Sequence, residues 1–226
     1  MSKKLVITGS EGLIGKKLCE HFCDQFDLIK LDLSLGHDLT NEKFVSSFFE
    51  DNKGLYGVII CHAFNPIPQK NIKKVEPVDF PLNEVRDYFE VNVLSAYDIC
   101  RNFIKNNKKG RIVNITSLYG RLSPKHHIYN NFTKHIGYSL SKSSVVMLSK
   151  YLATYYKNFN INTVVLGGVR DERQEDEFVK NYSSNTPAGR LMNINEVPPV
   201  FDFLLNEKST YVTGTEIEVD GGWNAW

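Results

Sequence analysis

The feature that most constrains the fold is a glycine-rich turn between a short β-branched run and an amphipathic helical pattern. Residues 3–8 read Lys-Lys-Leu-Val-Ile-Thr, and the turn continues as Gly9-Ser10-Glu11-Gly12-Leu13-Ile14-Gly15. A strand, a glycine turn and a helix in this order form the context of a dinucleotide-binding fingerprint. The glycines permit a tight turn close to a pyrophosphate, and the helix N-terminus stabilises its charge. The alternative is a plain connection between a strand and a helix.

An acidic residue closes the next predicted strand, which covers residues 27–33. Asp32 follows Gly9 by 23 residues. At that distance a carboxylate accepts hydrogen bonds from the adenosine ribose of a bound dinucleotide. No basic residue follows Asp32 directly, so we expect NAD to be preferred over NADP, whose 2′-phosphate would repel the carboxylate. The alternative is a strand-end carboxylate that faces water, and Lys30 is the neighbour that would soften the repulsion.

Strand patterns alternate with helical patterns along the whole chain. The expected strands are 3–8, 27–33, 57–62, 111–117, 161–166 and 215–219, and the expected helices after the first are 41–52, 83–108, 138–157 and 195–206. This alternation predicts βαβ units and a Rossmann-type, doubly wound parallel sheet in one domain, 1–226. We expect residues 118–137 to be irregular, residues 170–190 to be a charged mobile stretch, and Thr40 to cap the helix that follows it.

Composition excludes several functional classes. The 226 residues carry a formal net charge of +1 without a basic block, which gives no case for binding nucleic acid or a membrane surface. The four cysteines form no Cys-x-x-Cys pair, so we expect free, buried or half-buried thiols in a cytoplasmic protein. His126, His127 and His135 lack metal-ligand spacing, and we expect no metal site.

Tyr138 and Lys142 are four residues apart on a predicted helix and therefore share one face. A nearby ammonium favours a phenolate, so the pair suits proton transfer at a substrate oxygen. The pattern also arises by chance in many chains, and a surface tyrosine beside a solvated lysine is the alternative. Two other polar residues lie at positions where a functional role is plausible from the sequence pattern. Ser117 ends a strand, and Asn92 is set among apolar helix neighbours.

Together these motifs resemble the short-chain dehydrogenase/reductase family over nearly the whole chain. The matching residues are the turn 8–15, Asp38-Leu39-Thr40, Asn92, the strand 113–117, Tyr138 with Lys142, Gly167-Gly168 and the segment 211–222. The resemblance implies that Tyr138 is the catalytic acid or base. It also implies that Lys142 holds the nicotinamide ribose and lowers the tyrosine pKa, that Ser117 donates to the substrate oxygen, and that Asn92 anchors a proton-relay water.

The resemblance also implies which residues bind the cofactor. They are Gly9, Gly12, Leu13, Ile14, Gly15, Asp32, Asp38, Leu39, His62, Ala63, Tyr138, Lys142 and Val169. The chain departs from the family at several of these places. Cys61-His62-Ala63-Phe64 replaces the usual Asn-Asn-Ala-Gly beside the adenosine, and Leu166 replaces the usual proline. The glycine spacing and Ser117-Leu-Tyr-Gly are typical of the sugar-nucleotide branch, whereas Val219-Asp-Gly-Gly is typical of the compact branch.

The short chain predicts that the helix between the second and third family strands is missing. The third strand would then be vestigial, leaving six or seven strands with the family order 2-1-4-5-6-7 at the core. Residues 83–108 and 138–157 are apolar on more than one face, so we expect a homodimer or homotetramer.

Three functions remain open at this point. The first is an alcohol/carbonyl oxidoreductase acting on a small molecule. Polar residues of 118–137 and 170–190 suggest a sugar or nucleotide sugar as its substrate, and the alternative is that these residues form a solvated lid: Tyr119, Arg121, His126, His127, Tyr129, Asn130, Asn131, Arg170 and Asp171. The second is an NAD-using sugar epimerase or dehydratase, which the short C-terminal region disfavours. The third is a non-catalytic dinucleotide sensor, which the intact Tyr138–Lys142 pair disfavours.

Overall fold

Six parallel strands form the sheet of the computed structural model, which describes residues 2–66, 74–129 and 132–225. The strands are β1 (Lys4–Thr8), β2 (Asp27–Leu31), β3 (Gly57–Ile60), β4 (Gly110–Ser117), β5 (Phe159–Leu166) and β6 (Glu216–Val219). Their order is β2-β1-β3-β4-β5-β6. This is the predicted family order without the third family strand, and it confirms the doubly wound α/β fold. All carboxyl ends therefore meet at one edge of the sheet, where ligands bind in such folds.

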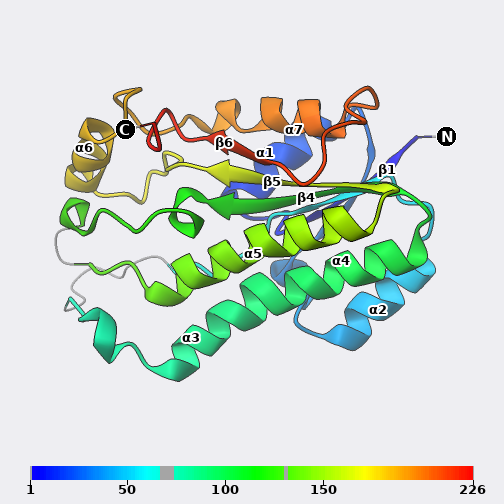
Figure 1. The fold of residues 1–226 in the computed structure, drawn as a ribbon, viewed down its shortest axis with the longest axis horizontal. Coiled ribbons are helices and arrows are strands. Elements are labelled where there is room, and N and C mark those ends of the chain that lie inside the picture. The colour runs from blue at the N-terminus through cyan, green and yellow to red at the C-terminus, as the bar shows by residue number, and fades with distance from the viewer. Residues whose placement is uncertain (1, 67–73, 130–131, 226) are drawn as a thin grey trace.

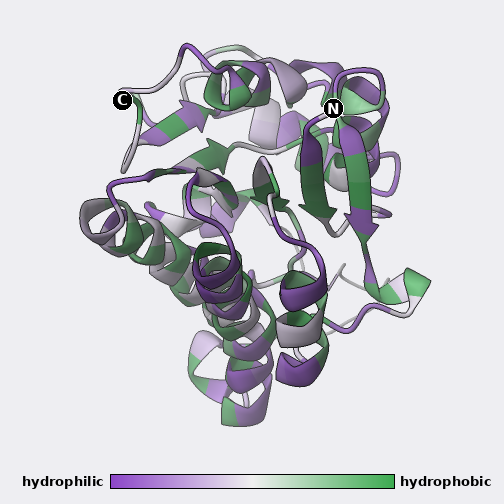
Figure 2. Cartoon of the chain, turned by 90° about the vertical axis from the view of Figure 1, so that its right-hand side faces the viewer, coloured by the Kyte–Doolittle hydropathy of each residue, from purple (hydrophilic) through white to green (hydrophobic). Residues whose placement is uncertain are grey.

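Successive side chains of the strands pack alternately into two hydrophobic cores, one on each face of the sheet. Val6 packs into one core and its neighbours Leu5 and Ile7 pack into the other. This follows from the two-residue period of a strand. Both faces are covered at the centre of the sheet, so β1 and β3 are almost continuous apolar runs. Figure 2 shows hydrophobic residues concentrated in the central strands and mixed residues along the surrounding helices.

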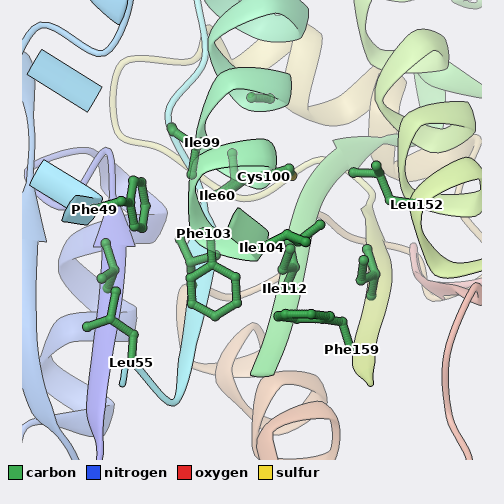
Figure 3. Close-up of a cluster of buried hydrophobic side chains, with 14 of the residues drawn as sticks. Phe49, Leu55, Ile60, Ile99, Cys100, Phe103, Ile104, Ile112, Leu152 and Phe159 are labelled. Atoms are coloured by element: carbon green, nitrogen blue, oxygen red, sulfur yellow. The ribbon is translucent and has the colours of Figure 1, made fainter. Parts of the chain in front are cut away.

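The helices divide between the two faces, as Figure 1 shows. On one face lie α1 (Leu13–Phe22) and α7 (Pro198–Leu205). On the other lie α2 (Glu42–Asp51), α3 (Leu82–Phe89), α4 (Ser95–Asn106) and α5 (Ile136–Tyr155). Aromatic and aliphatic side chains of α2, α4 and α5 fill the core on this face, which also contains Val6. Phe49, Phe103 and Leu152 are among them (Figure 3).

The connection between β2 and α2 contains no α-helix and no strand. A three-residue 3₁₀ turn, Leu33–Leu35, is the regular element of this connection, and it confirms that the usual family helix is missing. The capping residue of α2 was predicted wrongly. Asn41, and not Thr40, accepts hydrogen bonds from the first-turn amides of Lys43 and Phe44.

Two other elements differ from expectation. The stretch 170–190, expected to be mobile, contains the helix α6 (Asp176–Ser184), held by the buried side chain of Tyr182. The long helix expected at 83–108 is α3 and α4 joined by a π-helical turn, Glu90–Leu94. Such turns recur at functional sites, and this one contains Asn92. None of the described helices is both long enough and apolar enough to cross a membrane.

Candidate active site

A cleft of about 1810 Å³ opens along the carboxyl ends of the strands. Its volume exceeds the roughly 300–1,000 Å³ of a pocket for one drug-sized ligand, so a dinucleotide and a second molecule can share it. All thirteen residues expected to bind the cofactor line this cleft: Gly9, Gly12, Leu13, Ile14, Gly15, Asp32, Asp38, Leu39, His62, Ala63, Tyr138, Lys142 and Val169. Ser117 lines it as well, whereas Asn92 is buried behind it.

The glycine turn is shaped by contacts that leave no space for side chains. Gly9 has a φ of +63°, and a Cβ there would lie 2.7 Å from the Cα of His62. A Cβ on Gly15 would overlap the carbonyl oxygen of Gly9. Gly12 begins α1 without a side-chain cap, and the first turn of α1 carries no acidic residue. The uncapped amides therefore suit a phosphate group, so these residues fit the pyrophosphate of a dinucleotide.

Asp32 and Asp38 line the cleft after β2, and both carboxylates are held by local hydrogen bonds. The carboxylate of Asp32 accepts two hydrogen bonds from Ser34, one from its backbone N at 2.9 Å and one from its Oγ at 2.8 Å. It accepts a third from the backbone amide of Glu11 at 3.0 Å. Burial raises the pKa of Asp32, but these hydrogen bonds outweigh it and keep the pKa below its usual value. Asp38 accepts from the amide and hydroxyl of Thr40, and the same bonds lower its pKa.

His62 bridges two elements behind the cofactor cleft. One ring nitrogen lies 2.8 Å from Thr8 Oγ1 on β1, and the other lies 2.6 Å from Ser95 Oγ on α4. Burial lowers the pKa of His62 to about 4, and the positive charge of Lys142 acts in the same direction. The imidazole is therefore neutral at pH 7. It ties β1 to α4 in the place where the family usually has an asparagine.

Ser117, Tyr138 and Lys142 meet on the floor of the cleft. Ser117 ends β4, and its hydroxyl lies near enough to the phenol of Tyr138, in the first turn of α5, to lower the pKa of that phenol. The buried ammonium of Lys142 lies 6.0 Å from the centroid of the Tyr138 ring. It donates to the carbonyl oxygen of Ile115 at 3.1 Å. One hydroxyl, one phenol and one ammonium therefore face the same part of the cleft.

The pKa of Tyr138 differs from expectation. Burial raises it, and the hydrogen bond with Ser117 lowers it by less. The ammonium of Lys142 donates to the Ile115 carbonyl, and the lowering of the tyrosine pKa by Lys142 stays a prediction. Burial also lowers the pKa of Lys142 to about 8. At pH 7 the phenol therefore carries its proton.

Asn92 has the partners that a buried amide requires. Its Oδ1 accepts from the amide of Phe64 at 2.6 Å, and its Nδ2 donates to the carbonyl of Phe64 and to Ser141 Oγ, at 3.1 Å and 3.0 Å. Ser141 in turn donates to the carbonyl of Tyr138. Asn92 thus joins the loop after β3 to the first turn of α5, beside Lys142.

The part of the cleft expected to hold a substrate is lined by some of the polar residues that the sequence suggested. Tyr119, Tyr129 and Asp171 line it, whereas Arg121 pairs with Glu216 and Glu218 away from it. His126, His127 and Arg170 lie outside the lining, and Asn130 and Asn131 lie outside the described residues. Residues that the sequence interpretation missed include Phe132, Lys134 and, from α6 and the loop before it, Arg173, Gln174, Glu175, Glu177 and Phe178. No cluster of metal-ligating side chains occurs in the part of the chain described here.

Comparison with known proteins decides the family. The family model described as enoyl-(acyl carrier protein) reductase, one of the short-chain dehydrogenase models, matches residues 5–224. The chain is a short-chain dehydrogenase/reductase. The uncharacterized oxidoreductase YmfI of Bacillus subtilis is 27% identical, and the alignment covers 99% of this chain and 100% of YmfI.

Solved structures of other short-chain dehydrogenases share the fold. The enzyme of Leptospira borgpetersenii with bound NAD⁺ is 25% identical and superposes with a TM-score of 0.85, over 99% of this chain and 93% of its own. A small-chain dehydrogenase in complex with NADPH superposes with a TM-score of 0.84 at 19% identity, over all of both chains. This short-chain dehydrogenase/reductase therefore has neighbours with either coenzyme.

Proposed function

We propose that this short-chain dehydrogenase/reductase interconverts an alcohol and a carbonyl compound by hydride transfer, with NAD preferred as coenzyme. One observation carries the proposal. The hydroxyl of Ser117, the phenol of Tyr138 and the ammonium of Lys142 converge on the floor of the cleft that the glycine turn opens. We propose that residues 1–226 act as one cofactor-binding and catalytic domain.

The three groups have complementary roles at the reacting oxygen. Tyr138, protonated at pH 7, donates its proton to a carbonyl oxygen during reduction and takes it back during oxidation. Ser117 donates a hydrogen bond to the same oxygen and stabilises the charge that develops on it. Lys142 supplies a positive charge behind the phenol. Asn92 keeps Lys142 and Tyr138 in place through its bonds to Ser141 and Phe64, and we assign it the family role in proton relay.

The cofactor site fits a nicotinamide dinucleotide. When bound, the nicotinamide ring would accept or supply the hydride. The first-turn amides of α1 would hold the pyrophosphate, Asp32 the adenosine ribose, and Lys142 the nicotinamide ribose. Leu39, Ala63 and Val169 line the walls between these groups.

The preference for NAD rests on the charges around Asp32. The described cleft residues near it are Leu33, His37, Asp38, Leu39 and Thr40, and none of them is a lysine or an arginine. Lys30 is exposed on β2 and does not line the cleft. A 2′-phosphate would therefore meet two carboxylates, and none of these described neighbours of Asp32 is a lysine or an arginine that would compensate the charge. At an effective dielectric constant near 20 the repulsion is on the order of a few kcal/mol.

The substrate class follows from the other end of the cleft. Phenols, carboxylates and an amide line it, from Tyr119, Tyr129, Asp171, Gln174 and Glu175. Such a lining offers hydrogen bonds to several hydroxyl groups. We propose a small hydroxylated substrate of the sugar type.

The test is the replacement of Tyr138 by Phe. The variant should bind NADH and melt like the wild type, and its kcat should fall about 10²- to 10⁴-fold because the transferable proton is lost. Tyr155→Phe is the matched control, since Tyr155 is 70% exposed at the far end of the same helix. Activity of Tyr138→Phe equal to that of Tyr155→Phe would refute the assignment.

A further inference from the structure

Lys134 places a second ammonium group at the reaction centre. Its Nζ lies over the ring of Tyr138, 3.9 Å from the ring centroid. It also donates to Oδ1 of Asn65, at 2.5 Å, in the loop that follows β3. Lys134 lines the cleft and precedes α5, so its ammonium lies between the catalytic phenol and the wall formed by Phe64 and Asn65.

The surroundings of this ammonium are poor in negative charge. Among the described residues, none brings a carboxylate within salt-bridge distance of Lys134, and the segments 67–73 and 130–131 contain no Asp or Glu. Its hydrogen-bond partner Asn65 is neutral. Burial and, to a smaller extent, the positive charge of Lys142 together lower the pKa of Lys134 to about 7. A partly buried ammonium without a counter-ion is unfavourable, and an anionic ligand would relieve that cost.

Acidic residues lie elsewhere in the cleft. Asp171 is already paired with Arg173, and Glu175 and Glu177 belong to the α6 side. The substrate end therefore has a cation beside Tyr138 and carboxylates beside α6. A ligand that carries an anionic group at one end and hydroxyl groups at the other would match this arrangement.

We propose that Lys134 binds a carboxylate of the substrate, so that the substrate is a hydroxy acid in the oxidising direction and an oxo acid in the reducing direction. The proposal rests on the proposed function and narrows its substrate class. Lys134 then determines specificity: it turns the carboxylate toward Asn65 and leaves the adjacent carbinol facing Ser117 and Tyr138.

The experiment compares pairs of substrates. One member of each pair carries a carboxylate, and the other carries a CH₂OH group in its place. Suitable pairs are D-gluconate with D-sorbitol, L-lactate with propane-1,2-diol, and 3-hydroxybutyrate with butane-1,3-diol, each with NAD⁺. The wild type should oxidise the acid with the higher kcat/KM in at least one pair and favour the neutral compound in none. Lys134→Gln should reduce kcat/KM for that acid about 10- to 100-fold, mainly through KM, and should leave the neutral partner nearly unchanged.

Control variants separate substrate binding from other roles. Lys134→Arg keeps the charge and should retain most of the acid preference, whereas Lys134→Met, of similar length, should lose it. Lys105→Gln removes an exposed charge on α4, outside the cleft, and should have no effect. If Lys134 acted only on Tyr138, Lys134→Gln would lower kcat equally for both members of a pair, and this result would overturn the proposal.

The two proposals fail in different ways. Titration with NADH, followed by protein fluorescence, reports on the cofactor site alone. A wild type that binds NADH but prefers the acid in none of the pairs overturns the role of Lys134 and leaves the proposed function standing. A wild type that does not bind NADH overturns the proposed function itself.

Discussion

Asp32 has a structural task in addition to its proposed role in coenzyme choice. Its carboxylate holds the turn after β2 through Ser34 and the glycine turn through the amide of Glu11. Replacement by alanine would remove both bonds, so asparagine is the better probe because it retains an acceptor oxygen.

We expect the wild type to have the higher kcat/KM with NAD and the Asp32→Asn variant to narrow this preference, because the charge that repels a 2′-phosphate is gone. Steady-state kinetics with both coenzymes measure the effect. Lys30→Gln serves as a control, since its side chain is exposed and outside the cleft. A wild type that prefers NADP would contradict the assignment.

His62 makes the fold sensitive to acid. Its pKa in the folded protein, about 4, lies below the ordinary value near 6.5, so the unfolded chain binds the proton more readily. The contribution of His62 is therefore fully present above pH 6.5 and is lost as the pH falls toward 4.

The substitution His62→Asn, which restores the family residue, should make the stability of the fold depend less on pH between 6.5 and 4. Thermal melts at pH 7, 6, 5 and 4 would show a smaller loss of Tm in the variant than in the wild type. Thr8, Ser95 and the charges of Lys142 and Asp32 surround the ring and remain in both proteins. Parallel curves for the two proteins would show that His62 does not carry the acid sensitivity.

The sequence identified the glycine turn, Asp32, Ser117 and Tyr138 because each has a fixed offset from the end of a strand or the start of a helix. Lys134 was missed because its importance comes from the path of an irregular segment and from one side-chain conformation. The sign of the Tyr138 pKa shift was missed for a similar reason. Whether Lys142 or burial dominates depends on where the ammonium points.

Among the elements, the strands were the most predictable, because buried parallel strands are short apolar runs with sharp ends. The helix α6 was missed because its sequence, Asp-Glu-Phe-Val-Lys-Asn-Tyr-Ser-Ser, is mostly polar. Phe178 and Tyr182, four residues apart, were the available helical signal. The π-helical turn around Asn92 has no sequence period of its own, and the hydrogen bonds of Asn92 to Phe64 and Ser141 accompany it.

The helix α4 owes its position to Phe103. This side chain is fully buried and packs edge-on against Phe49 of α2, at 6.2 Å, and Phe159 of β5, at 6.0 Å. Phe103→Ala should lower the free energy of unfolding by about 3–5 kcal/mol. That corresponds to roughly 6–20 °C in Tm for a chain of this size. Phe203→Ala, on the half-exposed face of α7, should change Tm by far less, and equal losses in the two variants would count against this account.

For the whole molecule, the helix α5 has a second apolar face. Val145 and Leu152 are buried. On the outer face the large exposed side chains include Leu140, Met147, Tyr151 and Tyr155; Leu94 of the π-helical turn and Tyr97 of α4 are exposed as well. Met147, Tyr151 and Tyr155 are each more than 60% exposed, which is unusual for apolar residues grouped on one surface.

We therefore expect a homodimer or homotetramer in which these helices pack against their copies. Light scattering at micromolar concentration should give at least twice the mass of one chain, 25.9 kDa. Met147→Glu should shift the mass toward the monomer, because it would bury a charge in the contact. Phe203→Glu, on the opposite side of the sheet, should not, and a monomeric wild type would rule out this interface.

The missing family strand leaves β2 at the border of the sheet, bonded to β1 on one side alone. The border strand of a sheet can recruit a strand from another molecule and begin aggregation. Charged residues and short length oppose this. β2 is five residues long, with exposed Asp27 and Lys30 beside its apolar positions. Lys30, exposed on this strand and outside the cleft, therefore opposes the addition of a further strand at this edge.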